Sequence, residues 1–132
     1  MNILITGVSA GLGKSLKDRY LKLGYNVYGL SRTRVTDCNH VTLNLNIMSH
    51  NHYKKRLTSL LKGELDIDLV ILNAGILGKI KTFDNVEMYE LEKIMNVNVF
   101  SNKLILDNLF EMGVNVKQVI CISSGASQKT YK

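Results

Sequence analysis

The feature that most constrains this chain is a glycine-rich loop between a short apolar run and an amphipathic segment near the N-terminus. Residues 2–6 read NILIT, which is typical of a buried strand, and residues 6–15 continue as TGVSAGLGKS. Gly24 ends a predicted helix over 11–23, in which apolar side chains recur at Leu12, Leu16, Tyr20 and Leu23. This order brings the free N–H groups of a helix start beside a strand end. The segment therefore predicts a phosphate-binding turn.

The rest of the chain alternates strands and helices. Strand-like apolar runs lie at residues 26–30, 41–45, 68–72 and 117–123. Helical segments lie at 49–61 and 87–112, the second preceded by a capping-box pattern at Asp84 and Glu87 and bent near 96–98. Near-continuous apolar strands joined by helices predict a parallel sheet covered on both faces. With right-handed crossovers we expect an α/β, doubly wound sheet in the order 3-2-1-4-5, with a crevice at the carboxyl ends of the strands.

Composition excludes several classes of protein. The 132 residues are 45% hydrophobic and 21% charged, which predicts a single globular domain over residues 1–132. No apolar run is long enough to span a membrane, and the N-terminal run lacks the basic flank of a signal peptide. Two cysteines, Cys38 and Cys121, are too few for a disulfide scaffold. We expect a cytoplasmic protein with free thiols, with Cys121 buried in a strand.

The net charge of +6 raises the question of an anionic partner. The basic residues are scattered, and only residues 54–56 form a run, so we expect a basic solvated surface and no nucleic-acid partner. A phosphorylated nucleotide is the alternative anion. The pairs Cys38/His40 and His50/His52 contain side chains that can bind a metal. Residues two apart on a helix, such as His50 and His52, do not share a face, and we predict no metal site.

Two familiar phosphate-binding patterns differ from this loop. A Walker A loop needs glycine where Val8 stands, although residues 13–15 fit its end. Asp68 precedes the apolar run of its strand and so does not stand at the strand's end, where a triphosphatase would need an acid. The strict Gly-x-Gly-x-x-Gly pattern is also absent. The pattern present is Thr-Gly-x-x-x-Gly-x-Gly.

Three further segments follow this loop in order: residues 73–75 (NAG), 97–99 (VNV) and 122–125 (ISSG). Together they resemble the N-terminal portion of the classical short-chain dehydrogenase/reductase family, from Thr6 to Ser124. The resemblance implies a Rossmann-type fold that lacks the family's C-terminal strands and helices.

The resemblance also implies which residues bind a nicotinamide dinucleotide. The loop glycines would cradle the pyrophosphate, residues 73–75 would run beside the adenosine ribose, and Asn44 stands where the family has an Asp that accepts from the adenine amino group. The predicted cofactor-binding residues are Gly7, Ser9, Gly11, Leu12, Gly13, Ser31, Arg32, Asn44, Leu45, Asn73, Ala74 and Gly75.

The end of the second strand predicts which dinucleotide is preferred. An acid there would hold the ribose 2′-hydroxyl of NAD, but residues 30–34 read LSRTR and contain none. Arg32 offers a planar fork of donors suited to a 2′-phosphate, and Ser31 and Thr33 add hydroxyl groups. We therefore predict NADP(H) over NAD(H).

The family's chemistry uses a Ser, a Tyr, a Lys and a helical Asn. Ser124 and Asn98 match the Ser and the Asn, which bind the substrate oxygen and support a proton-relay water. The family's Tyr-x-x-x-Lys lies roughly a dozen residues beyond the Ser, and Tyr131-Lys132 does not fit that spacing. We expect an NADP(H)-dependent oxidoreductase that transfers hydride between nicotinamide and a carbonyl or alcohol substrate, incomplete for catalysis in these 132 residues. The alternative is a non-catalytic NADP(H)-binding module, an inactive subunit or a remnant.

The missing elements would leave apolar surface uncovered. The fifth strand would form a sheet edge, and the long helix would expose a stripe of apolar residues. We therefore predict a homodimer or higher oligomer, with no membrane partner. The stripe consists of Val97, Phe100, Leu104 and Ile105. Earlier in the same helix, Met88, Leu91 and Met95 have the spacing of a core face.

Overall fold

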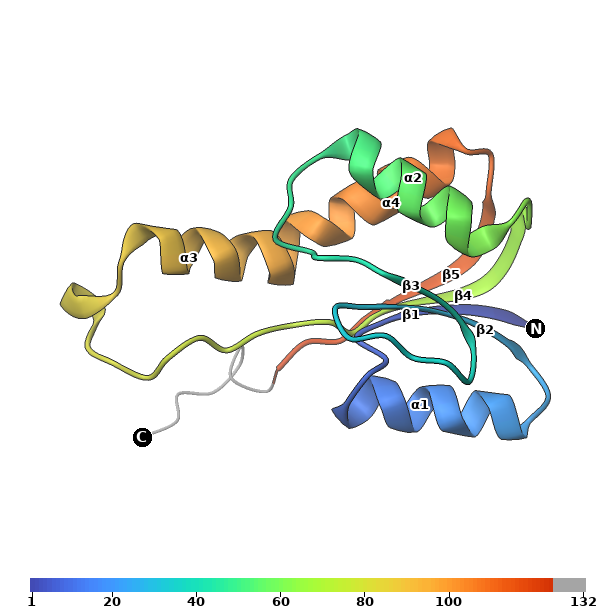
Figure 1. Cartoon of the computed structure of the whole chain (residues 1–132), viewed down its shortest axis with the longest axis horizontal. Helices are drawn as coiled ribbons and strands as arrows, with labels where there is room; N and C mark the ends of the chain where they lie inside the picture. Colours follow the sequence, from blue (N-terminus) through green and yellow to red (C-terminus); the bar gives the residue numbers. More distant parts are fainter. Residues whose placement is uncertain (125–132) are drawn as a thin grey trace.

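Five parallel strands form one sheet in the order β3-β2-β1-β4-β5, as the alternation of strands and helices predicts. The structure is a computed structural model, and it describes residues 1–124. Helix α1 covers one face of the sheet, and α2 and α4 cover the other (Figure 1). The strands are β1 (Asn2–Thr6), β2 (Asn26–Ser31), β3 (Asn39–Thr42), β4 (Asp66–Leu72) and β5 (Asn115–Cys121). The α-helices are α1 (Gly11–Lys22), α2 (His50–Leu61), α3 (Met88–Met95) and α4 (Ser101–Glu111).

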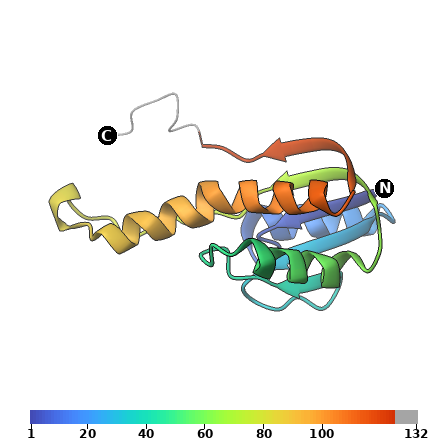
Figure 2. The same ribbon diagram turned by 90° about the horizontal axis from the view of Figure 1, so that it is seen from above.

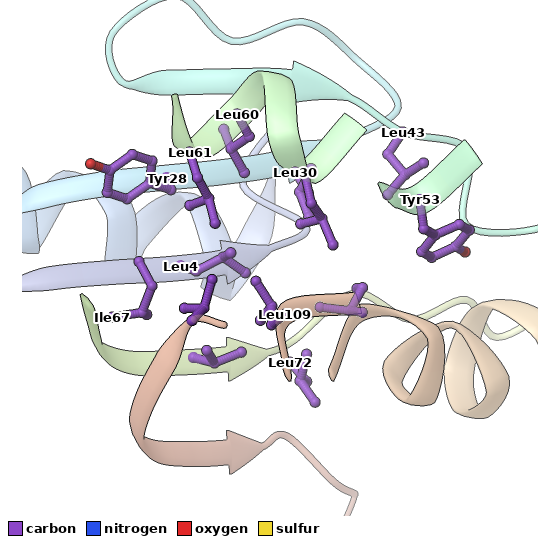
Figure 3. Close-up of a cluster of buried hydrophobic side chains, with 14 of the residues drawn as sticks. Leu4, Tyr28, Leu30, Leu43, Tyr53, Leu60, Leu61, Ile67, Leu72 and Leu109 are labelled. Carbon is purple, nitrogen blue, oxygen red and sulfur yellow. The ribbon is translucent and has the colours of Figure 1, made fainter. Parts of the chain in front are cut away.

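Side-chain alternation along the strands builds one core on each face. Along β1, Ile3 and Ile5 belong to the core beneath α1, whereas Leu4 belongs to the core beneath α2 and α4 (Figure 3). On α1, the predicted positions Leu16 and Tyr20 pack against the first core. Leu12 and Leu23, which have the same helical spacing, are each 50% exposed, Leu12 in the first turn and Leu23 at the C-cap.

Strand boundaries differ from the predicted ones because pairing, not apolarity, decides them. β3 pairs with β2 only over Asn39–Thr42. Leu43 and Leu45 of the predicted strand are buried, but they lie beyond the last paired residue. The polar residues Asp66 and Asn115 begin β4 and β5 because they pair with each other. Helix α2 begins one residue after the predicted start, since Ser49 is its N-cap.

The long helix predicted over 87–112 is present but consists of three helical segments. A π-helical segment over Asn96–Phe100 joins α3 to α4 at the position where the sequence predicts a bend, and the three segments run on as one rod (Figure 2). The capping box predicted at Asp84 is wrong, because Phe83–Asn85 form a 3₁₀ turn. The capping box lies one turn later, where Glu87 and Glu90 cap α3 reciprocally.

The sheet edge and the outer half of this rod expose apolar side chains. α3 buries none of its residues, so the core face predicted for Met88, Leu91 and Met95 is wrong; α3 extends beyond the sheet (Figure 1). Cys121 is exposed and not buried, because β5 is an edge strand. The predicted exposed stripe is also largely wrong. Val97 and Ile105 are buried and Leu104 is half-buried, whereas Phe100 is exposed. Oligomer formation stays a prediction.

Within residues 1–124, no helix is both long enough and apolar enough to cross a bilayer.

Candidate functional site

The glycine loop between β1 and α1 is folded so tightly that two of its glycines are required. Gly7 has a φ of +76°, in the left-handed region that favours glycine. Gly13 is buried in the first turn of α1, and a Cβ added there would overlap the carbonyl oxygen of Gly7. Helix α1 therefore starts in direct contact with the loop backbone.

The start of α1 has no partner within the described chain for its free N–H groups. The N-cap residue is Ala10, which offers no side-chain acceptor, and the first turn carries no acid. The first intrahelical bond is donated by the Lys14 N–H to the Ala10 carbonyl at 3.3 Å. An uncapped helix start with its partial positive charge is suited to an anion.

Thr6 and Asn73 fasten the carboxyl ends of β1 and β4 to each other. The Thr6 hydroxyl oxygen is fully buried and accepts hydrogen bonds from the N–H groups of Asn73 at 3.0 Å and Ala74 at 2.9 Å. The side-chain amide of Asn73 donates back to the Thr6 carbonyl at 3.1 Å. These bonds fix the glycine loop against the segment that follows β4.

A cavity of about 310 Å³ opens where these strand ends meet. It is lined by most of the predicted cofactor-binding residues: Gly7, Ser9, Ser31, Arg32, Asn44, Leu45, Asn73, Ala74 and Gly75. The other three, Gly11, Leu12 and Gly13, form the adjoining first turn of α1. The cavity is thus located at the carboxyl edge of the sheet, where the fold predicts a ligand crevice.

The lining also contains residues that the sequence did not indicate. They are Ala10, Leu43, Ile76, Lys93 and Val97, beside Thr33, which was expected only as an added hydroxyl. Lys93 and Val97 are four residues apart on one helical face, and this i, i+4 spacing before Asn98 is the signal that could have found them. Lys93 is exposed, and its side chain makes no hydrogen bond or ion pair within residues 1–124.

Asn98 lies in the π-helical segment and holds the chain after β4. Its side-chain oxygen accepts from the Ile76 N–H, and its amide donates to the Ile76 carbonyl, both at 2.8 Å. Both ends of the amide are therefore engaged in positioning the cavity wall. Single-turn π-helices recur at functional sites. The water-relay role expected of Asn98 stays a prediction.

Ser124 follows β5 at the same edge of the sheet and is exposed. Its proposed contact with a substrate oxygen stays a prediction. Gly125 of the matching segment, and Tyr131 and Lys132, lie outside the described residues.

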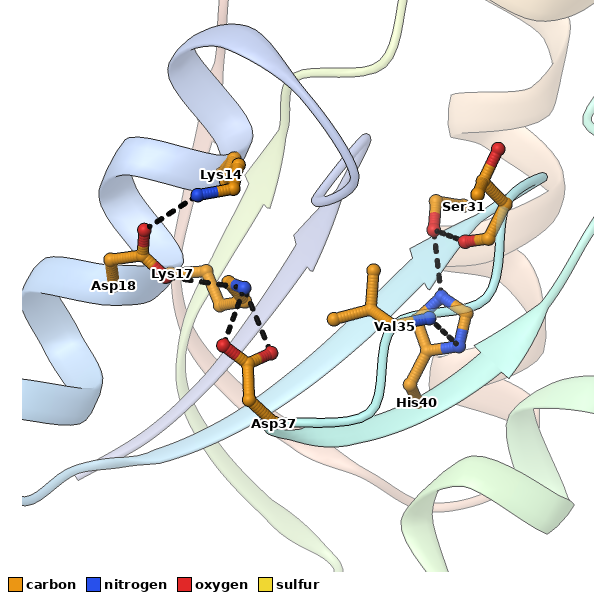
Figure 4. A network of polar contacts seen from close by, with 8 residues as sticks. Lys14, Lys17, Asp18, Ser31, Val35, Asp37 and His40 are labelled. Carbon is orange, nitrogen blue, oxygen red and sulfur yellow. Dashed lines mark hydrogen bonds and ion pairs between the residues drawn. The ribbon is translucent and has the colours of Figure 1, made fainter.

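The loop that carries Arg32 is held by a chain of polar contacts (Figure 4). The Ser31 hydroxyl donates to the Thr33 carbonyl at 2.6 Å and lies 2.7 Å from His40 Nε2. His40 Nδ1 accepts from the Val35 N–H at 3.4 Å, so Nε2 carries the proton and donates to Ser31. A neutral His40 thus fixes the backbone on both sides of Arg32.

A salt bridge joins the same loop to α1. Lys17 is buried, and its ammonium donates to both carboxylate oxygens of Asp37 at 2.8 Å (Figure 4). Burial opposes the charge on Lys17, but hydrogen bonds and charge attraction from Asp37 and Asp18 outweigh it and raise the pKa of Lys17. The pair keeps Lys17 charged and the loop in place.

The protonation of His40 predicts a pH dependence of stability. Burial, together with the charges of Arg34 and Lys17, lowers the pKa of His40 below its ordinary value. The unfolded chain therefore binds this proton more readily than the folded chain, and stability falls as pH drops through roughly 6.5, the ordinary His pKa. The measurement is urea unfolding of the protein and of His40→Gln across this pH range. We expect the stability advantage of the protein over the variant to decrease from about pH 7.5 to about pH 5.5.

The unmutated protein is the reference for this pH series, so only the difference between the two stability curves is assigned to His40. An unchanged slope in His40→Gln would contradict the assigned role of the neutral imidazole.

All 132 residues match the family model described as short chain dehydrogenase. The chain belongs to the short-chain dehydrogenase family. Among curated proteins it is 30% identical to a benzil reductase ((S)-benzoin forming) of Bacillus subtilis, over 98% of this chain and 57% of that protein. It is 25% identical to an NADPH-dependent pterin aldehyde reductase of Arabidopsis thaliana, over 93% of this chain and 56% of that protein. The chain thus spans little more than half the length of these relatives.

Solved structures show the same fold. Serine dehydrogenase from Escherichia coli superposes with a TM-score of 0.83 at 20% identity, covering 99% of this chain and 65% of that one. Aldohexose dehydrogenase from Thermoplasma acidophilum superposes with a TM-score of 0.78 at 21% identity, covering 93% of this chain and 49% of that one. Membership of the short-chain dehydrogenase family agrees with the observed strand order.

Proposed function

We propose that this chain binds NADP(H) and serves an oxidoreductase that transfers hydride between the nicotinamide and a carbonyl or alcohol substrate. The observation that carries the proposal is the composition of the cavity. It runs from the uncapped start of α1 to Arg32, and no carboxylate lines it within the described residues. An anion thus meets helix N–H groups at one end and a guanidinium at the other.

The cavity residues fit the parts of the dinucleotide. The pyrophosphate would bind at the start of α1, where only glycine fits at position 13. The adenine would lie near Leu43, Asn44 and Leu45, although the Asn44 side-chain oxygen also accepts from the Asn46 N–H at 3.0 Å. The 2′-phosphate would meet Arg32, whose side chain makes no hydrogen bond or ion pair within residues 1–124.

The relatives support both halves of the proposal. The Arabidopsis relative is a reductase named for its NADPH dependence, and the Bacillus relative is a reductase of the ketone benzil. When bound, the nicotinamide supplies or accepts the hydride. Of this chain's own residues, Asn98 would hold the cavity wall and Ser124 would hydrogen-bond the substrate oxygen.

The first test is titration of the chain with NADPH and with NADH, followed by the fluorescence of the reduced nicotinamide. We expect tighter binding of NADPH. In Arg32→Ala, NADPH binding should weaken about 10- to 100-fold, because a hydrogen bond to a charged group contributes about 1.5–3 kcal/mol, while NADH binding should hardly change.

Arg34→Ala is the control for the loss of one positive charge from the same loop. Arg34 does not line the cavity, so this variant should keep the preference for NADPH. Equal affinity of the wild-type chain for both dinucleotides would refute the NADP(H) preference, and binding of neither would refute the cofactor site.

A further inference from the structure

A second hollow of about 310 Å³ adjoins the cofactor cavity on the side of α2. Arg32, Leu43 and Asn44 line both hollows. His52 and Arg56 of α2 also line the second hollow. Arg32 therefore stands between the two hollows and belongs to the lining of each.

Helix α2 is held in a fixed orientation toward this hollow. Tyr53 is fully buried, and its hydroxyl donates to the Leu45 carbonyl at 2.9 Å, which joins α2 to the residue that directly follows Asn44 of the shared wall. Leu57 is also fully buried one turn later. His52 and Arg56 precede these two residues and are themselves one turn apart, so they present half-buried side chains on the same side of the helix.

The second hollow is positively charged and has no internal counterion. None of its lining residues is acidic, and residues 38–63 contain no Asp or Glu. Within residues 1–124 the side chains of Arg32, His52 and Arg56 make no hydrogen bond or ion pair. Lys17, by contrast, is paired with Asp37. Unpaired basic groups around one hollow repel one another unless an anion lies between them.

We propose that Arg56 and His52 form the second wall of the 2′-phosphate site, facing Arg32. This inference rests on the proposed NADP(H) function. A phosphate monoester carries a charge of about −1.5 to −2 near neutral pH, and Arg32 alone supplies one positive charge. The Arg56 guanidinium of α2 neutralises the phosphate charge that Arg32 leaves uncompensated, and it hydrogen-bonds the phosphate from the opposite side. Specificity for the 2′-phosphate is thus shared between the end of β2 and α2.

The test compares Arg56→Ala with Lys55→Ala, using NADPH, NADH and adenosine 2′,5′-bisphosphate as ligands. Lys55 is the neighbouring residue on α2; it is exposed and faces a different part of the surface. We expect Arg56→Ala to weaken NADPH and the bisphosphate about tenfold or more, with NADH unchanged. Lys55→Ala should leave all three affinities unchanged. Arg56→Gln, which keeps most of the side-chain volume, checks the result if the alanine variant folds poorly.

The outcomes separate this inference from the function on which it rests. If the wild-type chain prefers NADPH and both Arg56 variants bind it as tightly as the wild type, the assignment of Arg56 is wrong. An equal loss in Lys55→Ala would mean that a general positive field, and not a built site, attracts the phosphate. A wild-type chain that binds neither dinucleotide would overturn the proposed function and this inference together.

Discussion

Gly13→Ala is expected to lose most of the chain's stability and all measurable NADPH binding. The new methyl group would overlap the Gly7 carbonyl and crowd the Asn73 side-chain amide, and backbone atoms cannot move aside as a flexible side chain can. Overpacking in a core costs about 1–3 kcal/mol, and a backbone clash costs more, so we expect a loss of roughly 3 kcal/mol or more. Urea unfolding and NADPH titration of the same preparation measure both effects.

Gly113→Ala is the matched control for this substitution. Gly113 follows α4 with a φ of +77°, and a Cβ added there meets no atom within 4 Å. It should lose only the strain of a left-handed alanine, about 1–2 kcal/mol, with NADPH binding retained. Equal losses in the two variants would show that the close approach of α1 to the loop is not what requires Gly13.

The fold could be predicted because its signals are local and repeated. The apolar run of β1 and the helical spacing that follows it specify one strand–helix unit, and right-handed connection of such units leaves few sheet orders. The glycine loop could be recognised for the same reason, since its spacing encodes a turn that only glycine can make. The position of Arg32 beside the cavity could be predicted because this residue lies two positions after the predicted strand over 26–30.

The incorrect burial predictions concern residues whose spacing along the sequence does not indicate whether another element covers them. Met88, Leu91 and Met95 have amphipathic spacing, but no helix or strand of residues 1–124 covers α3, so Met88 and Met95 are exposed and Leu91 is only half-buried. Cys121 has strand-like neighbours, but its strand is at the edge of the sheet. In both cases the tertiary surroundings decide the outcome, and the local pattern does not contain them.

Local sequence is equally unable to predict the exposure of charged residues at the candidate site. In the sequence, Arg56 belongs to a basic run over residues 54–56 and is predicted to be solvated. In the structure Lys54 and Lys55 are exposed, whereas Arg56 is half-buried against a hollow that it shares with Arg32. The two arginines line one hollow only when α2 packs over the sheet, and no local motif encodes that arrangement.

Thr6→Val is expected to weaken both the fold and cofactor binding, because one hydroxyl oxygen joins the two walls of the cavity. Valine preserves the shape of the side chain but removes the acceptor for the N–H groups of Asn73 and Ala74. An unsatisfied buried donor costs about 1–3 kcal/mol, and these two donors are only partly buried, so we expect a loss of about 2 kcal/mol in unfolding free energy. NADPH binding should weaken as well, since Asn73 and Ala74 line the cavity.

Thr6→Ser separates the hydrogen bonds of Thr6 from its packing. Serine keeps the oxygen and loses the methyl group, which costs about 1 kcal/mol in a buried position. If the hydroxyl is what matters, Thr6→Val is the less stable variant and binds NADPH more weakly, although it loses no apolar volume. If packing matters more, the order of stability reverses, and the link between the ends of β1 and β4 contributes little to the site.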